Sequence, residues 1–495
     1  MTSTLFGLIL YFVLIALVAV WTWGKNRTKE DFILGGRRLG PWVIAFSERS
    51  SGESAWLVLG LSGALYSLGL VEIWTIIGCV SGIIFYWSVI AQRLRVVSEE
   101  YGAITLPEFF SKFSGKYGPA VRIISMLVIV FFFSFYVAAQ FIGAGKILNT
   151  TFYMDVSLGM PLAALIVILY TMMGGFMAVS FTDFVQAILM IITLVIMPVI
   201  GLMMIQAQGL DIRMAMSATG HTASLLGGNM GWAGAAAVIG GLSWGFGYMG
   251  QPHLVTRFMA INRPEAIRIG RKVAMTWTIL AYCGAALIGI VGITLVYYNQ
   301  IPTEGLVGPQ SDPERVLPLL AGFLLPAWIA GILISGAVAA MMSTADSQLL
   351  IATSTIVEDF YSKALGKELS QKSLVMMSRV VTVLVGVAGY GLAWSSDDLI
   401  YDVVSLAWSG LGSSFGPALL LSLHWKGMNG RGVLTGMLTG ALSTVAWKWI
   451  PGFDALISVR FASFVLASGA AAIGSLSVKI SLRNLKSRDD LSIRF

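Results

Sequence analysis

The residues of this chain that could do chemistry stand out because three charged ones interrupt a long hydrophobic stretch. Residues 47–54 read Ser-Glu-Arg-Ser-Ser-Gly-Glu-Ser and place Glu48, Arg49 and Glu53 between two apolar segments. Charges are costly at membrane depth, and serine and glycine weaken a helix at the same place. Because such an interruption is tolerated where opened backbone lines a cavity or an ion site, the pattern favours a transporter. Arg49 and Glu53 are four residues apart, which favours a structural ion pair over a proton relay.

A second interruption lies in the other half of the chain. Residues 240–253 contain five glycines and Pro252, with Trp244 and Tyr248 among them, and form a poor continuous helix. Interrupted spans at matching places in two halves are typical of an inverted-repeat transporter whose binding site lies where they meet. The alternative is that glycine is simply common in membrane helices. The coincidence of charge and glycine in the first interruption favours the binding-site interpretation.

Oxygen-bearing side chains concentrate in a third hydrophobic stretch, at Ser343, Thr344, Asp346 and Ser347. Hard cations prefer oxygen ligands, so these residues could hold sodium. The hydroxyls could equally bond back to their own helix, whereas Asp346 lies well inside its stretch and needs a partner or an ion. Asp183 opens another hydrophobic stretch, where it is either a helix N-cap or an ion ligand.

The composition requires a membrane environment for these elements. The chain is 57% hydrophobic and 12% charged, with a mean hydropathy of +0.81 and 55 glycines, as expected of one all-α integral membrane domain over residues 1–495. About thirteen stretches are long enough to span a bilayer. They cover residues 5–23, 41–69, 73–92, 120–148, 157–177, 182–206, 232–253, 273–298, 318–358, 375–394, 399–423, 431–450 and 460–480.

The five-span step between the two interruptions predicts the organisation of the chain. Residues 41–206 would form a first repeat and 232–423 a second one, with the first span and 431–480 as additions. Of the 32 Lys and Arg residues, 26 lie in or beside the loops after odd-numbered spans or in the C-terminal tail. This asymmetry predicts an N-terminus outside and a cytoplasmic tail over 481–495. The net charge of +7 is thus spread over short loops, which argues against nucleic-acid binding.

Several catalytic motifs are excluded. Gly241 to Gly245 fits the G-x-S-x-G pattern, but that motif needs a strand-turn-helix context, and here it lies in an apolar, glycine-rich span. His221, His253 and His424 are the only histidines, and there is neither an H-E-x-x-H motif nor a Walker loop. Cys79 and Cys283 lie in apolar stretches and predict neither a disulfide nor a thiolate metal site. We therefore expect no enzyme, and transport driven by an ion gradient.

Five segments of the sequence resemble the sodium/solute symporter family, and the similarity runs from about Leu5 to about Lys479. The segments are residues 33–41, 174–183, 244–253, 343–350 and 408–417. The resemblance implies the leucine-transporter type of five-plus-five inverted-repeat fold with discontinuous helices. It also implies sodium-coupled import of a small amino acid by alternating access across the bacterial inner membrane, with L-proline as the leading substrate.

The resemblance also assigns roles by position. The main sodium site would use the backbone carbonyls of Ser50, Glu53 and Ala340 and the hydroxyls of Ser343 and Thr344. The substrate pocket would map onto Trp56, Tyr136, Trp244, Tyr248 and Pro252, with Ser54 beside it. A further sodium site, present in some members, would map onto Asp183, Asp346 and Ser347.

One departure bears on the substrate. Where the proline carriers of this family read Ser-Asp-Met-Ser-Gly-Trp, this chain reads Ser-Gly-Glu-Ser-Ala-Trp over residues 51–56, so the acid has moved by one position and lengthened. Another small amino acid or a carboxylate therefore remains an alternative substrate. A transporter-like sensor is an alternative of a different class, but only about fifteen residues follow the last span and offer no output domain. A channel is disfavoured because two broken helices in an inverted repeat indicate alternating access.

Overall fold

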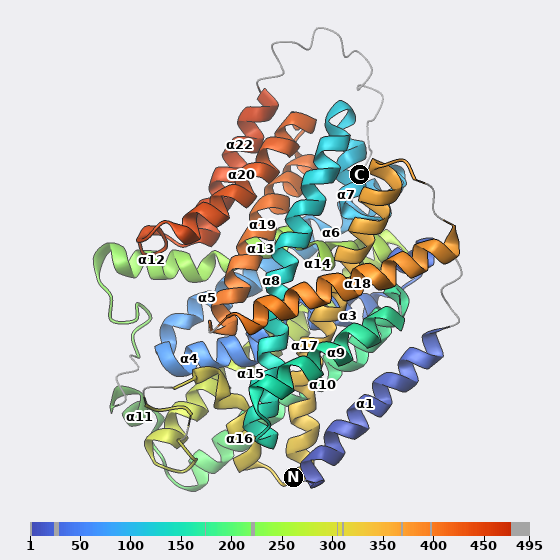
Figure 1. Cartoon of the computed structure of the whole chain (residues 1–495). Coiled ribbons are helices and arrows are strands. Elements are labelled where there is room, and N and C mark those ends of the chain that lie inside the picture. Colours follow the sequence, from blue (N-terminus) through green and yellow to red (C-terminus); the bar gives the residue numbers. More distant parts are fainter. Residues whose placement is uncertain are drawn as a thin grey trace.

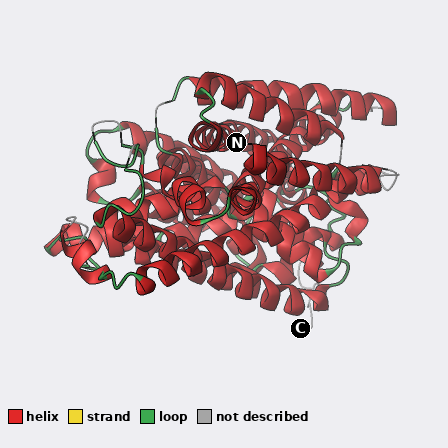
Figure 2. Cartoon of the chain, turned by 90° about the horizontal axis from the view of Figure 1, so that it is seen from below, coloured by secondary structure: helices red, strands yellow, loops and turns green. Residues whose placement is uncertain are grey.

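The computed structural model describes residues 2–23, 29–173, 175–218, 223–303, 305–308, 311–367, 370–396 and 398–476. His221 and the predicted tail 481–495 lie outside these ranges. Within them the chain is helical and forms no strand (Figure 2). A single bridge of strand type pairs Leu39 with Ile261. The all-α prediction is confirmed.

The helices of the N-terminal half include the long helix α8, which runs through the middle of the molecule (Figure 1). They are α1 (Thr2–Trp23), α2 (Lys29–Leu34), α3 (Pro41–Gly52), α4 (Ser62–Leu68), α5 (Ile73–Val89), α6 (Ala91–Glu100), α7 (Leu106–Phe113), α8 (Gly118–Phe152), α9 (Val156–Met173), α10 (Phe176–Ala207) and α11 (Ile212–Ala218). Short 3₁₀ turns cover Gly35–Arg37, Gly69–Glu72 and Gly115–Tyr117, and a π-helical segment covers Trp56–Leu61.

The C-terminal half packs around the same centre, with α20 and α22 side by side at the upper left of Figure 1. Its helices are α12 (Gly231–Leu242), α13 (Trp244–Gly247), α14 (Pro252–Ala260), α15 (Ile267–Tyr297), α16 (Val316–Leu324), α17 (Ala327–Ser354), α18 (Gln371–Trp394), α19 (Ile400–His424), α20 (Gly430–Trp449), α21 (Phe453–Leu456) and α22 (Val459–Leu476). The 3₁₀ turns are Tyr248–Gly250, Pro264–Ala266 and Pro313–Arg315, and Thr355–Ala364 is π-helical.

Both predicted interruptions are present. Helix α3 ends at Gly52, and Glu53 leaves the helical conformation with φ −108° and ψ 58°. The opened backbone is held by side chains, since Gln140 Oε1 accepts from the Ala55 N–H at 3.1 Å and Ser54 Oγ accepts from the Trp56 N–H at 3.3 Å. In the second half, Gln251 is extended at φ −78° and ψ 109° between a 3₁₀ turn and α14.

The predicted number of spans is only partly matched. Each predicted span overlaps a helix, but among the described residues nine stretches are long and apolar enough to cross a membrane. The predicted span 318–358 is divided, because the chain leaves the helix at Leu325 and Pro326, between α16 and α17. The exact number of thirteen therefore stays a prediction.

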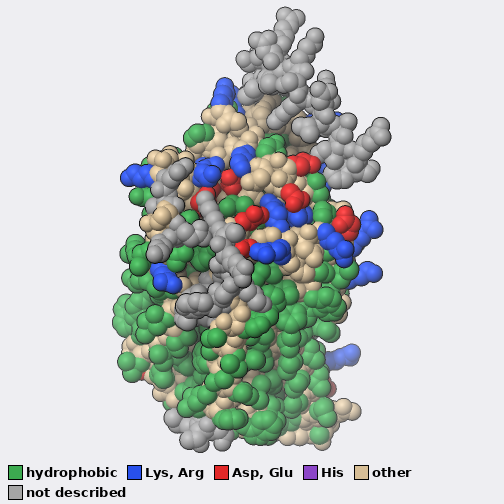
Figure 3. All heavy atoms as spheres, turned by 90° about the vertical axis from the view of Figure 1, so that its right-hand side faces the viewer, with side chains coloured by type: hydrophobic (Ala, Val, Ile, Leu, Met, Phe, Trp, Pro, Cys, Tyr) green, Lys and Arg blue, Asp and Glu red, His purple; other side chains and the backbone are tan. Residues whose placement is uncertain are grey.

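The surface has the character of a multi-pass membrane protein. Many large hydrophobic side chains are exposed, including Leu17, Val20 and Leu384 at 62–68%. On the face shown in Figure 3, hydrophobic side chains cover the middle and lower parts, whereas Lys, Arg, Asp and Glu gather above them. An apolar surface of this extent fits a lipid environment rather than water.

Candidate ion and substrate site

Hydroxyl and carbonyl oxygens converge where α17 passes the first helix break. Ser343 Oγ donates to the Ser50 carbonyl at 3.1 Å and lies 3.2 Å from the Ala340 carbonyl. The next hydroxyl, Thr344 Oγ1, donates to the Ser51 carbonyl at 3.0 Å. All of these residues are buried. Two hydroxyls thus reach across to the end of α3 instead of serving their own helix alone, which is an arrangement of oxygens suited to a hard cation.

The side chain of Glu53 is not part of this oxygen cluster and belongs to a separate group of charged residues. Arg49 Nη1 donates to Glu53 Oε1 at 2.8 Å, so the predicted ion pair is confirmed. Arg49 also pairs with Glu48, which the sequence had not suggested, and donates to Tyr86 at 2.8 Å. One arginine therefore neutralises part of the charge of two fully buried carboxylates, as burial at this depth requires.

The predicted aromatic residues form one cluster next to this ion pair. Trp56 stacks on Trp244, with ring centroids 4.7 Å apart and planes 9° from parallel. Tyr248 donates to Glu53 Oε1 at 3.0 Å, and Tyr136 lies beside Ser54. Pro252 is the first residue of α14 and fixes the end of the break.

Two residues of the cluster were not among the predicted site residues. Trp408 of α19 contacts the rings of Tyr136, Trp244 and Tyr248 at centroid distances of 6.2, 6.4 and 4.7 Å. Tyr282 of α15 lies 2.6 Å from the Tyr248 hydroxyl and donates to Glu53 Oε2 at 2.7 Å. Trp408 lies in one of the family-like segments, which was the available signal, whereas Tyr282 lies in a span with no interruption or motif.

Asp183 lies near the sodium-site oxygens and is not an N-cap. Helix α10 begins at Phe176 after Gly175, so Asp183 lies two turns inside it, and the N-cap alternative is wrong. Asp183 Oδ2 accepts from Ser47 Oγ at 2.7 Å and forms an ion pair with Arg257 Nη2 at 2.7 Å. The same Arg257 nitrogen lies 2.6 Å from Ser347 Oγ, which in turn donates to Asp346 Oδ1 at 3.2 Å. The structure thus brings the predicted residues of the second sodium site together around an arginine.

Arg257 is not among the predicted site residues, because the charge pattern of the sequence assigns it to the loop after residues 232–253. In the structure it lies on α14, and its side chain is 1% exposed. Its neighbours Val255, Phe258 and Met259 are apolar and buried. An arginine among apolar residues directly after the second interruption was the signal that could have revealed it.

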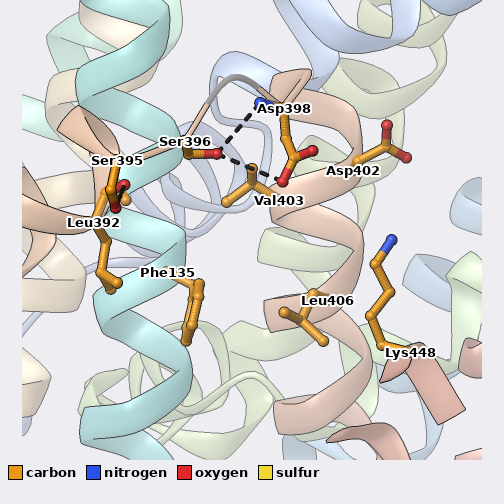
Figure 4. Close-up of a pocket in the computed structure, with 10 residues that line it drawn as sticks. Phe135, Leu392, Ser395, Ser396, Asp398, Asp402, Val403, Leu406 and Lys448 are labelled. Atoms are coloured by element: carbon orange, nitrogen blue, oxygen red, sulfur yellow. Dashed lines mark hydrogen bonds between the residues drawn. The ribbon is translucent and has the colours of Figure 1, made fainter. Parts of the chain in front are cut away.

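A separate cavity of about 390 Å³ lies between α8, the α18–α19 loop, α19 and α20. Asp398, Asp402 and Lys448 line it together with Phe135 and Leu406 (Figure 4). None of the predicted site residues lines this cavity. The assignment of the site is therefore based on side-chain contacts and not on the position of a cavity.

Comparisons with known proteins identify the family of the chain. Residues 32–440 match the Sodium:solute symporter family. The chain belongs to this family. Its relatives include the sodium/proline symporter of Escherichia coli strain K12, at 40% identity with 88% of each chain covered. They also include the high-affinity proline transporter PutP of Bacillus subtilis strain 168, at 37% identity, covering 92% of this chain and 97% of the relative.

Solved structures show the fold. A Na⁺-coupled sialic acid symporter in a substrate-bound, outward-open state has a TM-score of 0.76 at 17% identity, covering 95% of this chain and 98% of its own. MhsT in complex with L-phenylalanine has a TM-score of 0.52 at 13% identity, covering 88% and 98%. The leucine-transporter-like fold with discontinuous helices is confirmed.

Proposed function

We propose that this protein is a sodium-coupled symporter that imports a small amino acid, with L-proline as the first candidate. The observation that carries the proposal is the contact of the Ser343 and Thr344 hydroxyls with the Ser50 and Ser51 carbonyls at the end of α3, beside the aromatic cluster. An ion bound there would hold α17 against the broken helix, and the same break presents Trp56 to the substrate. The names of the relatives, sodium/proline symporter and proline transporter, support the choice of substrate.

The main sodium ion is assigned to the carbonyls of Ser50, Glu53 and Ala340 and the hydroxyls of Ser343 and Thr344. The substrate ring is assigned to Trp56, Tyr136, Trp244, Tyr248 and Pro252, with Ser54 available for a polar group. A small ring with an apolar body packs well against indole and phenol faces, while few polar groups fix its orientation. The second sodium site at Asp183, Asp346 and Ser347 stays a prediction.

Glu53 favours keeping a second substrate class open. Its carboxylate accepts from Tyr248 and Tyr282, so the shifted acid lies directly against a predicted substrate residue. A carboxylate at this position alters the polarity of the pocket wall, which favours testing other small amino acids and carboxylates beside proline. The transporter-like sensor remains the alternative of a different class.

We further propose that the protein lies in the bacterial inner membrane, with an external N-terminus and a cytoplasmic C-terminus. The Lys and Arg asymmetry of the loops supports this orientation. The repeats would be 41–206 and 232–423, each beginning with its discontinuous helix. Protease protection of terminal tags in right-side-out vesicles tests the orientation.

Uptake in proteoliposomes tests the function. A panel of radiolabelled amino acids and carboxylates is offered with an inward sodium gradient, and with potassium in place of sodium. We expect concentrative proline uptake only with sodium. Uptake of another panel member would correct the substrate, and proline uptake that ignores the sodium gradient would refute sodium coupling.

A further inference from the structure

The oxygen cluster around Asp183 already contains a cation. Three oxygens surround Arg257 Nη2: Asp183 Oδ2 at 2.7 Å, Ser51 Oγ at 2.7 Å and Ser347 Oγ at 2.6 Å. They come from three different helices, α10, α3 and α17. A positively charged nitrogen with three oxygens at such distances occupies the position that a bound cation would take in the same shell.

Further contacts fix the guanidinium in place. Arg257 Nε donates to Ser47 Oγ at 2.7 Å, and Nη1 donates to the His253 carbonyl of its own helix. The group is 1% exposed, so water does not screen it. A planar guanidinium with five donors keeps its charge and fits this set of acceptors better than a lysine would.

The same contacts link Arg257 to the main sodium site. Ser51 offers its hydroxyl to the Arg257 cluster, and its carbonyl accepts from Thr344 Oγ1 at 3.0 Å. Ser51 Oγ also lies 3.0 Å from the Ser343 carbonyl. A second sodium ion among these oxygens would stand next to the fixed positive charge of Arg257, and like charges repel strongly where water is excluded.

One carboxylate oxygen of the cluster accepts no hydrogen bond from the described residues. Asp183 is fully buried, and its Oδ1 has no hydrogen-bond partner among the described residues, whereas Oδ2 receives every donor. With the guanidinium removed, Asp183 would present both oxygens beside Ser51 and Ser347. The shell would then suit a small hard cation.

We propose that the Arg257 guanidinium occupies the second cation position beside Asp183, so that each substrate is carried with one sodium ion, bound at Ser343 and Thr344. This inference rests on the proposed sodium-coupled symport. It makes Arg257 the residue that sets the ion-to-substrate ratio, and it replaces the predicted second sodium by a charge belonging to the protein.

Ion counting on purified protein tests the proposal. Saturation binding of ²²Na⁺ gives the number of sites per protein, and reversal potentials of substrate flux in proteoliposomes give the transported ratio. We expect one sodium in the unmodified protein by both measurements, and an unchanged ratio in Asp346→Asn. Two sodium ions in the unmodified protein, or a ratio that falls in Asp346→Asn, would overturn the proposal.

Variants at Arg257 test whether the guanidinium keeps a second sodium ion out of the cluster. Arg257→Gln is expected to bind a second sodium with a steeper sodium dependence, Arg257→Lys to keep one, and the double variant Asp183→Asn with Arg257→Gln to return to one. Arg95→Gln is the matched control for loss of a buried arginine, since Arg95 bonds to the Ile261 carbonyl and Glu99, away from the cluster. A single sodium in folded Arg257→Gln would contradict the proposal.

If Arg257→Gln does not fold, the unmodified protein, Asp346→Asn and Arg257→Lys still decide the question. Failure of the proposed function would show itself differently, as an absence of sodium-dependent uptake in the unmodified protein.

Discussion

At the scale of single residues, Ser343 and Thr344 distinguish an ion site from ordinary helix back-bonding. Ser343→Ala together with Thr344→Ala should raise the sodium concentration for half-maximal uptake about tenfold or more. Each substitution removes one hydroxyl oxygen that would bind the sodium ion. A polar interaction with a charged group contributes about 1.5–3 kcal/mol. Substrate affinity at saturating sodium should change less. Sodium-dependent uptake kinetics measure both.

Ser354→Ala is the matched control for this pair, because Ser354 lies on the same helix. Among the described residues, its hydroxyl bonds only the Ile351 carbonyl, at 3.0 Å. It should keep the sodium dependence of the unmodified protein. A double variant that behaves like this control would return Ser343 and Thr344 to a purely structural role.

Tyr248 separates substrate recognition from core packing. Tyr248→Ala should weaken substrate binding by about 1–3 kcal/mol, the scale of one buried side chain, because a ring of the pocket is lost. Sodium binding without substrate should remain nearly intact. Calorimetric titration of sodium and substrate, each on its own, measures the two effects.

Tyr248→Phe keeps the ring and removes the hydroxyl that bonds Glu53 at 3.0 Å. It therefore measures the effect of this hydrogen bond on substrate affinity separately from that of the ring. If Tyr248→Ala protein loses only thermal stability and binds substrate with unchanged affinity, the aromatic cluster is ordinary core.

At the scale of elements, the sequence predicted both helix breaks because glycine, proline and buried charge act locally on the backbone. It did not predict what faces each break. Trp408 and Tyr282 reach the site from α19 and α15, and Arg257 reaches from α14 across to the end of α3. These positions follow from packing between helices distant in sequence. The apolar neighbours of Arg257 indicate burial, but a local pattern does not show which acceptors from α3, α10 and α17 surround its guanidinium.

The approach of α5 to the second broken helix gives a prediction at this scale. A Cβ added at Gly82 would lie 2.5 Å from Gly245 Cα, a distance that real Cβ contacts do not reach. Gly82→Ala should therefore lower the thermal stability of the protein in detergent, since overpacking typically costs about 1–3 kcal/mol. Substrate binding should fall with it, because Trp244 adjoins Gly245.

Gly391→Ala is the control, since a Cβ at this glycine of α18 meets no atom within 4 Å. Alanine is a better helix former than glycine by about 1 kcal/mol, so this variant should keep or gain stability. Equal behaviour of the two variants would show that the α5–α13 contact does not constrain the site.

At the scale of the whole molecule, contacts hold the chain together at both ends of the broken helices. At the α14 end, Arg37 Nη1 donates to the Met259 carbonyl at 2.7 Å, and the Asn262 N–H donates to the Leu39 carbonyl at 2.9 Å. At the opposite end, the buried Glu314 accepts from the backbone N–H groups of Ile400 and Tyr401, at 3.1 and 3.0 Å. The expected alternating-access mechanism requires that these two sets open in turn.

The Glu314 contacts form a latch, which faces outside in the proposed orientation and also includes Lys146 of α8. Lys146 pairs with Glu314 and lies 2.9 Å from Asp312. These contacts fix the start of α19 next to Gly60. A Cβ added at Gly60 would lie 3.5 Å from the Tyr401 nitrogen, which is an ordinary van der Waals contact. A cysteine at this position should be tolerated and shielded while the latch is closed.

Glu314→Gln should open this latch, because the amide loses the charge that attracts Lys146 and one of its acceptor functions. In a background with Cys79→Ala, Cys283→Ser and Gly60→Cys, a membrane-impermeant maleimide added outside should then label Gly60→Cys several times faster. Asp312→Asn is the control, because Asp312 bonds Lys146 without holding the backbone of α19, so its effect should be smaller. If Glu314→Gln is labelled as slowly as the parent, the charge of Glu314 does not keep this side closed. Packing of α16 on the broken helix would then be the cause.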